Sequence, residues 1–338
     1  MKAVSYRQRL PLDHADSLLD VELPNPAAPT GRDLLVRVEA VSVNPVDTKV
    51  RANADPKGAD KVLGWDAAGT VVAVGPEARL FKVGDAVFYA GAIERTGSNA
   101  ELQLVDERIV GRKPTSLSFA DAAALPLTSI TAWELLFDRL KVPYGKKPDA
   151  GAVLIVGGAG GVGSIAIQLA RRLTGLTVFA SASRAETREW VTALGAHHVV
   201  DHGQPMAPQI KAVVPQGVDY VLALTQTERH FTDLVDALKP QGALALIDDP
   251  KTPLDITLLK SKSLSLHWEL MFTRHRFQTP DMIAQHQLLN EVADLVDAGV
   301  LRTTQREHLG TINATNLKRA HALLESGRAV GKVVLSGF

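Results

Sequence analysis

The pattern of apolar and polar positions changes part-way along the chain. Up to about residue 125, short valine-rich runs such as 34–43, 69–75 and 85–91 are separated by Gly, Pro and Asp. Short apolar runs bounded by turn residues are typical of β-strands. The first part of the chain is therefore predicted to fold as a β-rich, barrel-like domain.

From Ala152 onward, short apolar runs alternate with amphipathic segments, beginning with 152–156 and 164–173. This alternation predicts a parallel sheet with helices on both faces. The uncharged stretch 150–170 contains six glycines, which divide it into a strand, a turn and a helix. For that reason we expect no membrane span there.

The segment 263–270 has a different pattern, in which Leu and Trp alternate with Ser, His and Glu. An inner parallel strand is apolar on both faces, so this alternation predicts a strand at the edge of the sheet. A helical pattern over 283–299 and a final apolar run over 331–337 follow. We expect both of these to return to the first domain.

The glycines within 158–163 follow the GxGxxG spacing directly after the apolar run 152–156. Glycine permits a tight turn and lets the backbone approach a pyrophosphate, which then lies against the N-terminus of the next helix. Such a spacing also occurs in structural loops, but the strand–turn–helix context favours a dinucleotide site. The cofactor-binding residues predicted in this turn are Gly158, Gly160, Gly161, Val162 and Gly163.

The end of the second strand indicates which nicotinamide cofactor binds. NAD sites usually place Asp or Glu here to accept hydrogen bonds from the ribose 2′-hydroxyl. This chain instead has Ser181, Ser183 and Arg184, with no acidic residue before Glu186. Hydroxyls and a guanidinium suit a 2′-phosphate, so NADP(H) is the predicted cofactor. The alternative is that Ser183 only caps the next helix and Arg184 is solvated.

Composition removes several other kinds of site. The chain has no cysteine, which excludes disulfides, thiolate catalysis and zinc sites built on sulfur. Lys plus Arg and Asp plus Glu both number 37. No one-signed field is therefore expected to attract nucleic acid or a membrane surface. The N-terminal segment lacks the apolar run of a signal peptide, and we expect a cytoplasmic protein.

The segments 42–51 and 124–136, together with the glycine turn, resemble the quinone oxidoreductase (zeta-crystallin-like) branch of the medium-chain dehydrogenase/reductase superfamily. Residues 267–283 are similar to its "zinc-type alcohol dehydrogenase-like" subfamily. The resemblance extends over nearly the whole chain. It implies an active site in a cleft between two domains, and a homodimer paired through strand 263–270.

The fold that the resemblance implies is of the α/β class. A doubly wound Rossmann domain over 128–271 would be inserted in a β-rich GroES-like catalytic domain made of 1–127 and 272–338. The partner of the active site would be a small-molecule acceptor, a quinone or an enone.

By the same resemblance, Asn44, Asp47 and Lys49 lie in a loop beside the nicotinamide and are the predicted catalytic residues. Many relatives have Tyr at the position of Lys49, so this lysine either stabilises a developing oxyanion or is a solvated surface residue. Thr128 and Lys332 match residues that approach the cofactor, with a helix N-cap as the alternative for Thr128. The aromatic residues predicted to line a flat substrate pocket, each also suited to core packing, are Trp65, Tyr89, Trp268 and Phe272.

The resemblance does not extend to a zinc site. Zinc-dependent relatives have Cys where this chain has Asn44, and a His-Glu pair where it has Trp65 and Asp66. Asn and Trp are not useful zinc ligands. The histidines within 197–202 adjoin a predicted strand and are not expected at the cleft. We therefore expect no metal.

A site without a metal or a Tyr-x-x-x-Lys pair has no strong electrophile to polarise a simple ketone. Electron-poor acceptors need less help. The predicted function is therefore zinc-independent hydride transfer from NADPH to quinones or other electron-poor carbonyl compounds. The alternatives are an enoyl or alkenal reductase, a non-enzymatic NADPH-binding sensor or structural protein, and a zinc alcohol dehydrogenase.

Overall fold

The computed structural model describes residues 1–338, which form two compact units. The β-rich unit comprises 1–130 and 272–338, and the Rossmann unit comprises 131–271. The first boundary therefore follows residue 130, where the sequence-based division follows residue 127. No helix in either unit is long and apolar enough to cross a membrane.

The β-rich unit is built from the valine-rich runs. One sheet has the order β2–β1–β4, and a seven-stranded sheet has the order β15–β16–β3–β5–β6–β8 with β7 paired to β3. The strands are β1 Lys2–Tyr6, β2 Leu19–Glu22, β3 Asp33–Val43, β4 Lys61–Val62, β5 Ala67–Val74, β6 Ala86–Tyr89, β7 Leu102–Asp106, β8 Val110–Arg112, β15 Gln305–His308 and β16 Lys332–Ser336. Strand β16 runs antiparallel to β3, which confirms that the final strand returns to the first part of the chain.

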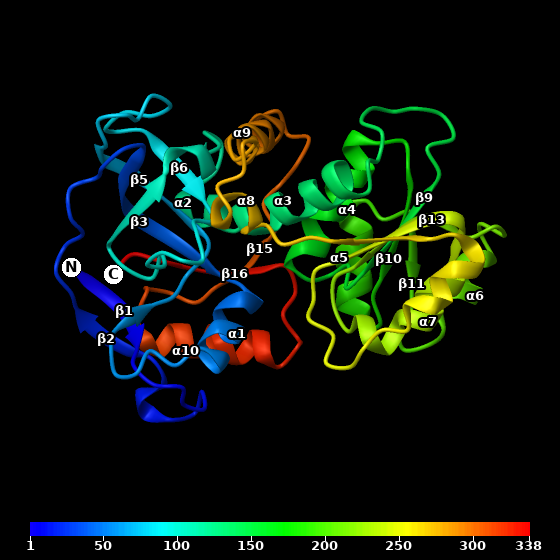
Figure 1. Ribbon diagram of the computed structural model, residues 1–338, viewed down its shortest axis with the longest axis horizontal. Coiled ribbons are helices and arrows are strands. Elements are labelled where there is room, and N and C mark those ends of the chain that lie inside the picture. Colours follow the sequence, from blue (N-terminus) through cyan, green and yellow to red (C-terminus); the bar gives the residue numbers. More distant parts are fainter. The chain divides into compact units, whose positions relative to one another are not determined.

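Helices lie around the strands of this unit (Figure 1). They are η1 Ala15–Ser17, α1 Pro45–Asn53, η2 Glu107–Ile109, α2 Phe119–Ala123, α3 Pro126–Trp133, which crosses the boundary of the unit, α8 Thr273–Arg276, α9 Ala284–Asp297 and α10 Ala314–Glu325. The prediction of a helix within 283–299 is confirmed by α9.

The Rossmann unit holds a six-stranded parallel sheet in the order β11–β10–β9–β12–β13–β14. Its strands are β9 Ala152–Val156, β10 Thr177–Ser181, β11 His198–Val200, β12 Val218–Ala223, β13 Leu238–Leu246 and β14 Ser265–Trp268. Its helices are η3 Glu134–Arg139, α4 Gly161–Leu173, α5 Ala185–Leu194, α6 Met206–Lys211, α7 Thr227–Ala237 and η4 Ile256–Lys262. Helices α4 and α5 lie on one side of the strands, and α6 and α7 on the other (Figure 1). This arrangement confirms the predicted α/β class.

The position of each strand in this sheet follows from its apolar pattern. Strand β9 is buried at every residue because neighbouring strands and helices enclose it. Leu154, Val221 and Leu244 of the inner strands pack in one core with Phe231 and Leu234 of α7. Strand β14 ends the sheet, which confirms the edge position predicted from its alternating pattern.

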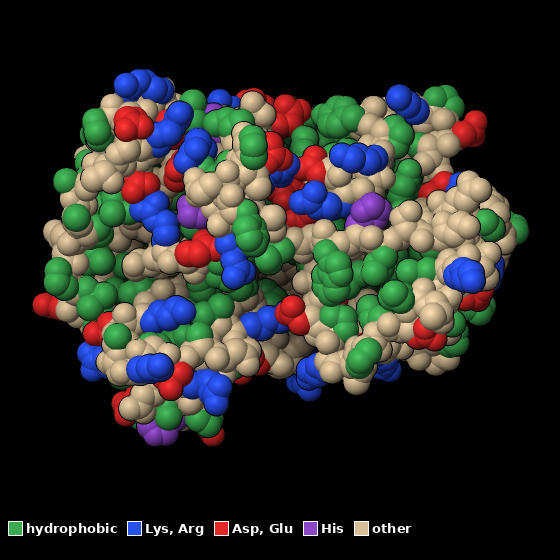
Figure 2. All heavy atoms as spheres, in the orientation of Figure 1, with side chains coloured by type: hydrophobic (Ala, Val, Ile, Leu, Met, Phe, Trp, Pro, Cys, Tyr) green, Lys and Arg blue, Asp and Glu red, His purple; other side chains and the backbone are tan.

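One face of the molecule carries charged side chains of both signs among apolar ones (Figure 2). Figure 2 shows basic and acidic side chains interspersed over one face of the molecule. This distribution agrees with the formal net charge of zero.

One buried histidine of the β-rich unit has no hydrogen bond. His321, on α10, has no exposed area, and neither ring nitrogen has a partner. Burial, together with the nearby Arg51 guanidinium, lowers the pKa of His321 to about 3. The imidazole is therefore neutral in the folded protein.

Replacing His321 with leucine is expected to reduce the loss of stability at acid pH. The unfolded chain takes up this proton near pH 6.5 and the folded chain only near pH 3. Protonation therefore favours unfolding as the pH falls through this range. Between pH 7 and pH 5, this group alone should lower the free energy of unfolding by about 2 kcal/mol. Chemical denaturation of wild type and His321→Leu at both pH values measures the difference. An equal loss in both proteins would assign the effect to other groups.

Candidate functional site

The predicted catalytic residues Asn44 and Asp47 lie at the start of helix α1. Pro45 occupies the first helical position, where a missing N–H leaves no hydrogen bond unmade. The Asn44 N–H donates to Asp47 Oδ2 at 2.7 Å, so the carboxylate caps the helix. The expectation that Asp47 and Lys49 lie in a loop was wrong. A proline directly after a capping residue is a helix start signal, and helix α1 begins at this proline.

Asp66, just before β5, connects three elements of the β-rich unit. It has no exposed area. Its Oδ1 accepts the N–H of Leu127 at 2.7 Å, in the first turn of α3. Its Oδ2 accepts from Asn44 Nδ2 at 2.8 Å and from Lys332 Nζ at 2.9 Å. Burial raises the pKa of Asp66, against the opposing effect of Lys332.

Lys332 completes this polar cluster from β16. Its ammonium also donates to the carbonyl of Val43 at 3.1 Å and to Asn44 Oδ1. A lysine has three N–H donors, so all three are used within the β-rich unit. Because Asn44 Oδ1 faces the ammonium, its Nδ2 points the other way. Nδ2 donates to Asp66 Oδ2 and, at 3.1 Å, to the carbonyl of Trp65. Both amide protons of Asn44 are therefore also used.

Asp47 keeps one carboxylate oxygen without a partner. This atom, Oδ1, is buried and accepts no hydrogen bond. Burial raises the pKa of Asp47 to about 7, an effect that Asp66 increases and that the Asn44 N–H and Lys332 oppose. Asp47 can therefore exchange a proton near neutral pH.

The other predicted residues of the β-rich unit differ in their exposure. Thr128 is buried within α3, and its hydroxyl donates to the carbonyl of Leu125 at 3.2 Å. The helix begins at Pro126, so Thr128 is not its N-cap. The side chain of Lys49 is exposed on α1.

The four aromatic residues are not brought to one place in a single unit. Trp65 and Phe272 are buried and meet edge to face, with ring centroids 6.2 Å apart. Tyr89 is also buried, and its hydroxyl has no partner. Trp268 lies on β14 of the Rossmann unit and is 54% exposed. A pocket lined by these four side chains stays a prediction.

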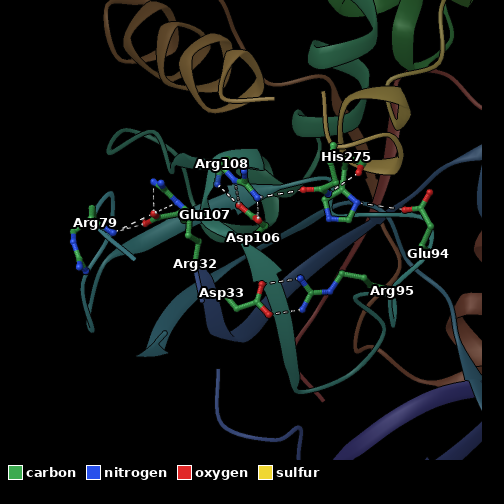
Figure 3. A network of polar contacts seen from close by, with 10 residues as sticks. Arg32, Asp33, Arg79, Glu94, Arg95, Asp106, Glu107, Arg108 and His275 are labelled. Carbon is green, nitrogen blue, oxygen red and sulfur yellow. Dashed lines mark hydrogen bonds and ion pairs between the residues drawn. The ribbon is translucent and has the colours of Figure 1, made fainter. Parts of the chain in front are cut away.

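A second polar network of the same unit lies around β7 and β3 (Figure 3). Glu107 has no exposed side-chain area; it accepts the N–H of Leu80 at 2.7 Å and pairs with Arg32. Asp33 and Arg95 form a bidentate ion pair at 2.8 Å. In each of these ion pairs the guanidinium and the carboxylate lie within hydrogen-bond distance of each other. Such pairs are typical of a network that holds loops in place.

The glycine turn connects β9 to α4 in the Rossmann unit. Gly157 has a φ of 76°, which favours glycine. A Cβ on Gly163 would lie 2.4 Å from the Gly157 carbonyl, so close packing of helix on turn requires glycine there. A Cβ on Gly160 would meet only one atom within 4 Å, at 3.4 Å. Packing within the chain therefore does not explain Gly160, and the approach of a pyrophosphate to this position stays a prediction.

The three residues predicted to select the cofactor differ in what they contact. Ser181 is buried, and its Oγ accepts the Gly157 N–H at 2.9 Å. It therefore anchors the glycine turn to β10. Ser183 and Arg184 are exposed before α5. The Arg184 N–H donates to Thr187 Oγ1 at 3.2 Å, so Thr187 and not Ser183 caps this helix.

The comparison with known proteins agrees with this arrangement. Residues 30–125 match the family described as alcohol dehydrogenase GroES-like domain, and residues 194–335 the family described as zinc-binding dehydrogenase. A zinc-type alcohol dehydrogenase-like protein of Staphylococcus aureus is 40% identical over 99% of this chain and 100% of its own length. The chain belongs to the medium-chain dehydrogenase/reductase superfamily.

Two further superfamily members extend the comparison. A 2-methylene-furan-3-one reductase of Solanum lycopersicum is 30% identical over 99% of this chain and 79% of its own length. The crystal structure of a Rhizobium etli protein, described by name as a zinc-dependent alcohol dehydrogenase, is 58% identical. It covers 100% of this chain and 98% of its own, with a TM-score of 0.96.

The residues of this superfamily member do not fit the zinc that these names imply. Zinc takes thiolate, imidazole or carboxylate ligands, and no three His, Cys, Asp or Glu side chains gather to hold a metal ion. Where buried oxygens of Asn44 and Asp66 converge, they already surround the Lys332 ammonium. A divalent cation there would be repelled by the ammonium.

Sequence reasoning missed two members of the cluster, Asp66 as a connecting residue and the N–H of Leu127. Asp66 was noted only as part of a Trp-Asp pair in place of His-Glu. The signal that could have identified it is a carboxylate directly before the apolar strand β5, because a buried carboxylate requires partners.

Replacing Ser181 with alanine is expected to weaken NADPH and NADH binding by the same factor. The substitution leaves the Gly157 N–H without its acceptor and loosens the turn that both cofactors share. Leaving a buried donor unpaired costs about 1–3 kcal/mol, which predicts roughly 5- to 150-fold weaker binding. Fluorescence titration with each cofactor measures the two dissociation constants. A loss confined to NADPH would instead assign Ser181 to the 2′-phosphate.

Proposed function

We propose that the protein is an NADPH-dependent reductase that transfers hydride to an electron-poor, conjugated carbonyl compound, either a quinone or an enone. The observation that carries the proposal is the buried cluster of Asn44, Asp66 and Lys332. The cluster lies in the β-rich unit. Its N–H donors are all hydrogen-bonded to acceptors within that unit, and it contains no set of metal ligands.

Two features of the Rossmann unit support NADPH as the donor. The glycine turn, which either nicotinamide cofactor would use, keeps an open position at Gly160. Arg184 lies exposed between β10 and α5, where a carboxylate would favour NAD and a guanidinium suits a 2′-phosphate.

The class of acceptor follows from the chemistry that the cluster lacks. A simple ketone needs a Lewis acid or a strong proton donor to accept hydride. Conjugation spreads the developing charge of an enone or a quinone, so weaker help is sufficient. The tomato relative is named for a conjugated exocyclic enone, which supports the same class.

The roles of the residues in this proposal are as follows. When bound, NADPH supplies the hydride. Asp47 holds a proton close to neutrality and delivers it, directly or through water, to the reduced acceptor. Lys49 is placed on the exposed side of α1, where its charge stabilises the developing oxyanion.

Replacing Arg184 with alanine is expected to weaken NADPH binding about 10- to 150-fold. The reason is the loss of a charge-assisted hydrogen bond worth about 1.5–3 kcal/mol. NADH lacks the phosphate, so its dissociation constant should stay nearly unchanged. Titration with both cofactors tests the difference, and Arg188→Ala on the same helix is a matched control. Equal losses for both cofactors would show that Arg184 does not read the 2′-phosphate.

An acceptor panel is expected to give NADPH oxidation with a para-quinone or an enone, and none of the reverse reaction with ethanol and NADP⁺. Lys49→Ala should lower the enone rate more than the quinone rate, because formation of an aromatic ring already favours charge on the quinol oxygen. Absorbance at the NADPH band follows both reactions. If none of the acceptors is reduced, a non-enzymatic binding protein is favoured. Oxidation of ethanol by metal-free protein would contradict the mechanism.

We also propose that two copies pair through β14. This strand ends the parallel sheet, and Trp268 and Leu270 beside its free edge are 54% and 49% exposed. An uncovered edge of this kind favours pairing with another strand. Leu266→Pro removes one donor from the edge and should give monomers in a sizing experiment at micromolar concentration. A monomeric wild type would contradict the pairing.

A further inference from the structure

The Lys332 ammonium and the oxygens around it come from three separate segments of the β-rich unit. Val43 ends β3 and Asn44 follows it, Asp66 precedes β5, and Lys332 begins β16. In the β3–β16 pairing Val333 lies opposite Val43, so the register itself places the Lys332 side chain beside Asn44. The side chain of Lys332 is 3% exposed and that of Asp66 is 0% exposed.

We infer that the Lys332 ammonium is the built-in cation of this site, and that it, not a metal ion, holds Asn44 and Asp66 together. The inference concerns the β-rich unit alone and holds whichever acceptor is reduced.

Charge balance supports a cation at this point. Asp66 and Asp47 are both buried carboxylates, and Lys332 acts on the two of them with an attractive charge. Truncating one partner of a buried ion pair leaves an uncompensated charge and is strongly destabilising. Lys332 therefore supplies the charge that pairs with Asp66.

Geometry gives the cation a positioning role. With its three donors on Val43 O, Asn44 Oδ1 and Asp66 Oδ2, the ammonium fixes which way the Asn44 amide points. Through Asp66 Oδ1 it is also linked to the N–H of Leu127, next to Thr128. A metal ion with an open coordination position could bind the oxygen of the acceptor. A saturated ammonium has no such position, so Lys332 positions its neighbours and does not activate the acceptor.

Two substitutions separate charge from volume. Lys332→Ala removes the ammonium and vacates its space, whereas Lys332→Met removes the charge but fills most of the space. The readouts are the thermal unfolding midpoint, which needs no substrate, and NADPH-dependent reduction of the acceptor. Each is measured alone, with methylammonium and with Co²⁺ added.

A matched control is available in the Rossmann unit. Lys262 donates to the carbonyls of Val235, Asp236 and Leu238 at 2.7–2.9 Å, so it is surrounded by three oxygens without a buried carboxylate. Lys262→Ala should lower the midpoint without any response to added cations, and without loss of activity at temperatures where it is folded.

For Lys332→Ala we expect a lower midpoint and about 10- to 150-fold lower activity, as for loss of charge-assisted hydrogen bonds. Added methylammonium or Co²⁺ should restore part of both. Lys332→Met should show the same losses without rescue, and wild type should contain no stoichiometric metal and respond to neither cation.

Three results would overturn the inference. The first is wild-type protein that retains about one divalent metal ion per chain after dialysis. The second is Lys332→Ala with a wild-type midpoint and only weakened NADPH binding, which would make Lys332 a cofactor contact. The third is a failure of both added cations to restore the midpoint or the activity of Lys332→Ala. An equal restoration in Lys332→Met and Lys332→Ala would count in the same way. If Lys332→Ala does not fold, the metal content and cation response of wild type and Lys332→Met still decide. Failure of every acceptor would contradict the proposed function, but it would leave the midpoint result standing.

Discussion

The arrangement of the β-rich unit depends on the burial of one carboxylate. A charged group removed from water must be matched by opposite charge and hydrogen bonds, or the fold that buries it is lost. Asp66 satisfies this requirement with an ammonium, an amide and a backbone N–H. Those partners come from β16, the start of α1 and the start of α3. The demands of one side chain therefore fix the meeting point of three elements.

The glycine turn of the Rossmann unit meets a different requirement, which is close packing of the turn against the helix that follows it. Its glycines remove side chains where the turn and helix pack, and Ser181 ties the turn to the next strand. The glycines thus leave space around the turn, and the serine holds the turn in place. Both are needed, because a turn that is open but mobile would lose binding energy in ordering itself.

Local patterns predicted most of the fold. The alternation in 263–270 identified an edge strand, and the valine-rich runs identified the β-rich unit, because periodicity reports directly which faces are buried. Helix α6 was not identified, since Met206–Lys211 is short and contains Pro208. The resemblance implies a loop at the start of α1, whereas the Asn-Pro start signal predicts the helix that forms there.

The site was less predictable than the fold. Asn44, Asp47 and Lys332 were predicted one by one from the resemblance, which did not link them to Asp66. The partners of Asp66 at Leu127 and Lys332 lie far away in sequence, and no spacing rule connects them. Ser181 was predicted as a cofactor-binding residue, but its contact with Gly157 depends on how two strands and a turn meet, which the sequence pattern does not encode.

The chain order of β16 has a consequence for synthesis. The whole Rossmann unit is made between Asn44 or Asp66 and the strand that carries Lys332. During translation, Asp66 therefore exists before its counter-charge, and the β-rich unit has to remain open, or hold this carboxylate protonated or in water, until the last strand arrives. Domains generally fold as they emerge, so here the inserted unit can fold first and the surrounding one must wait. Ribosome-bound intermediates of this protein would then contain a folded Rossmann unit and an incompletely folded β-rich unit.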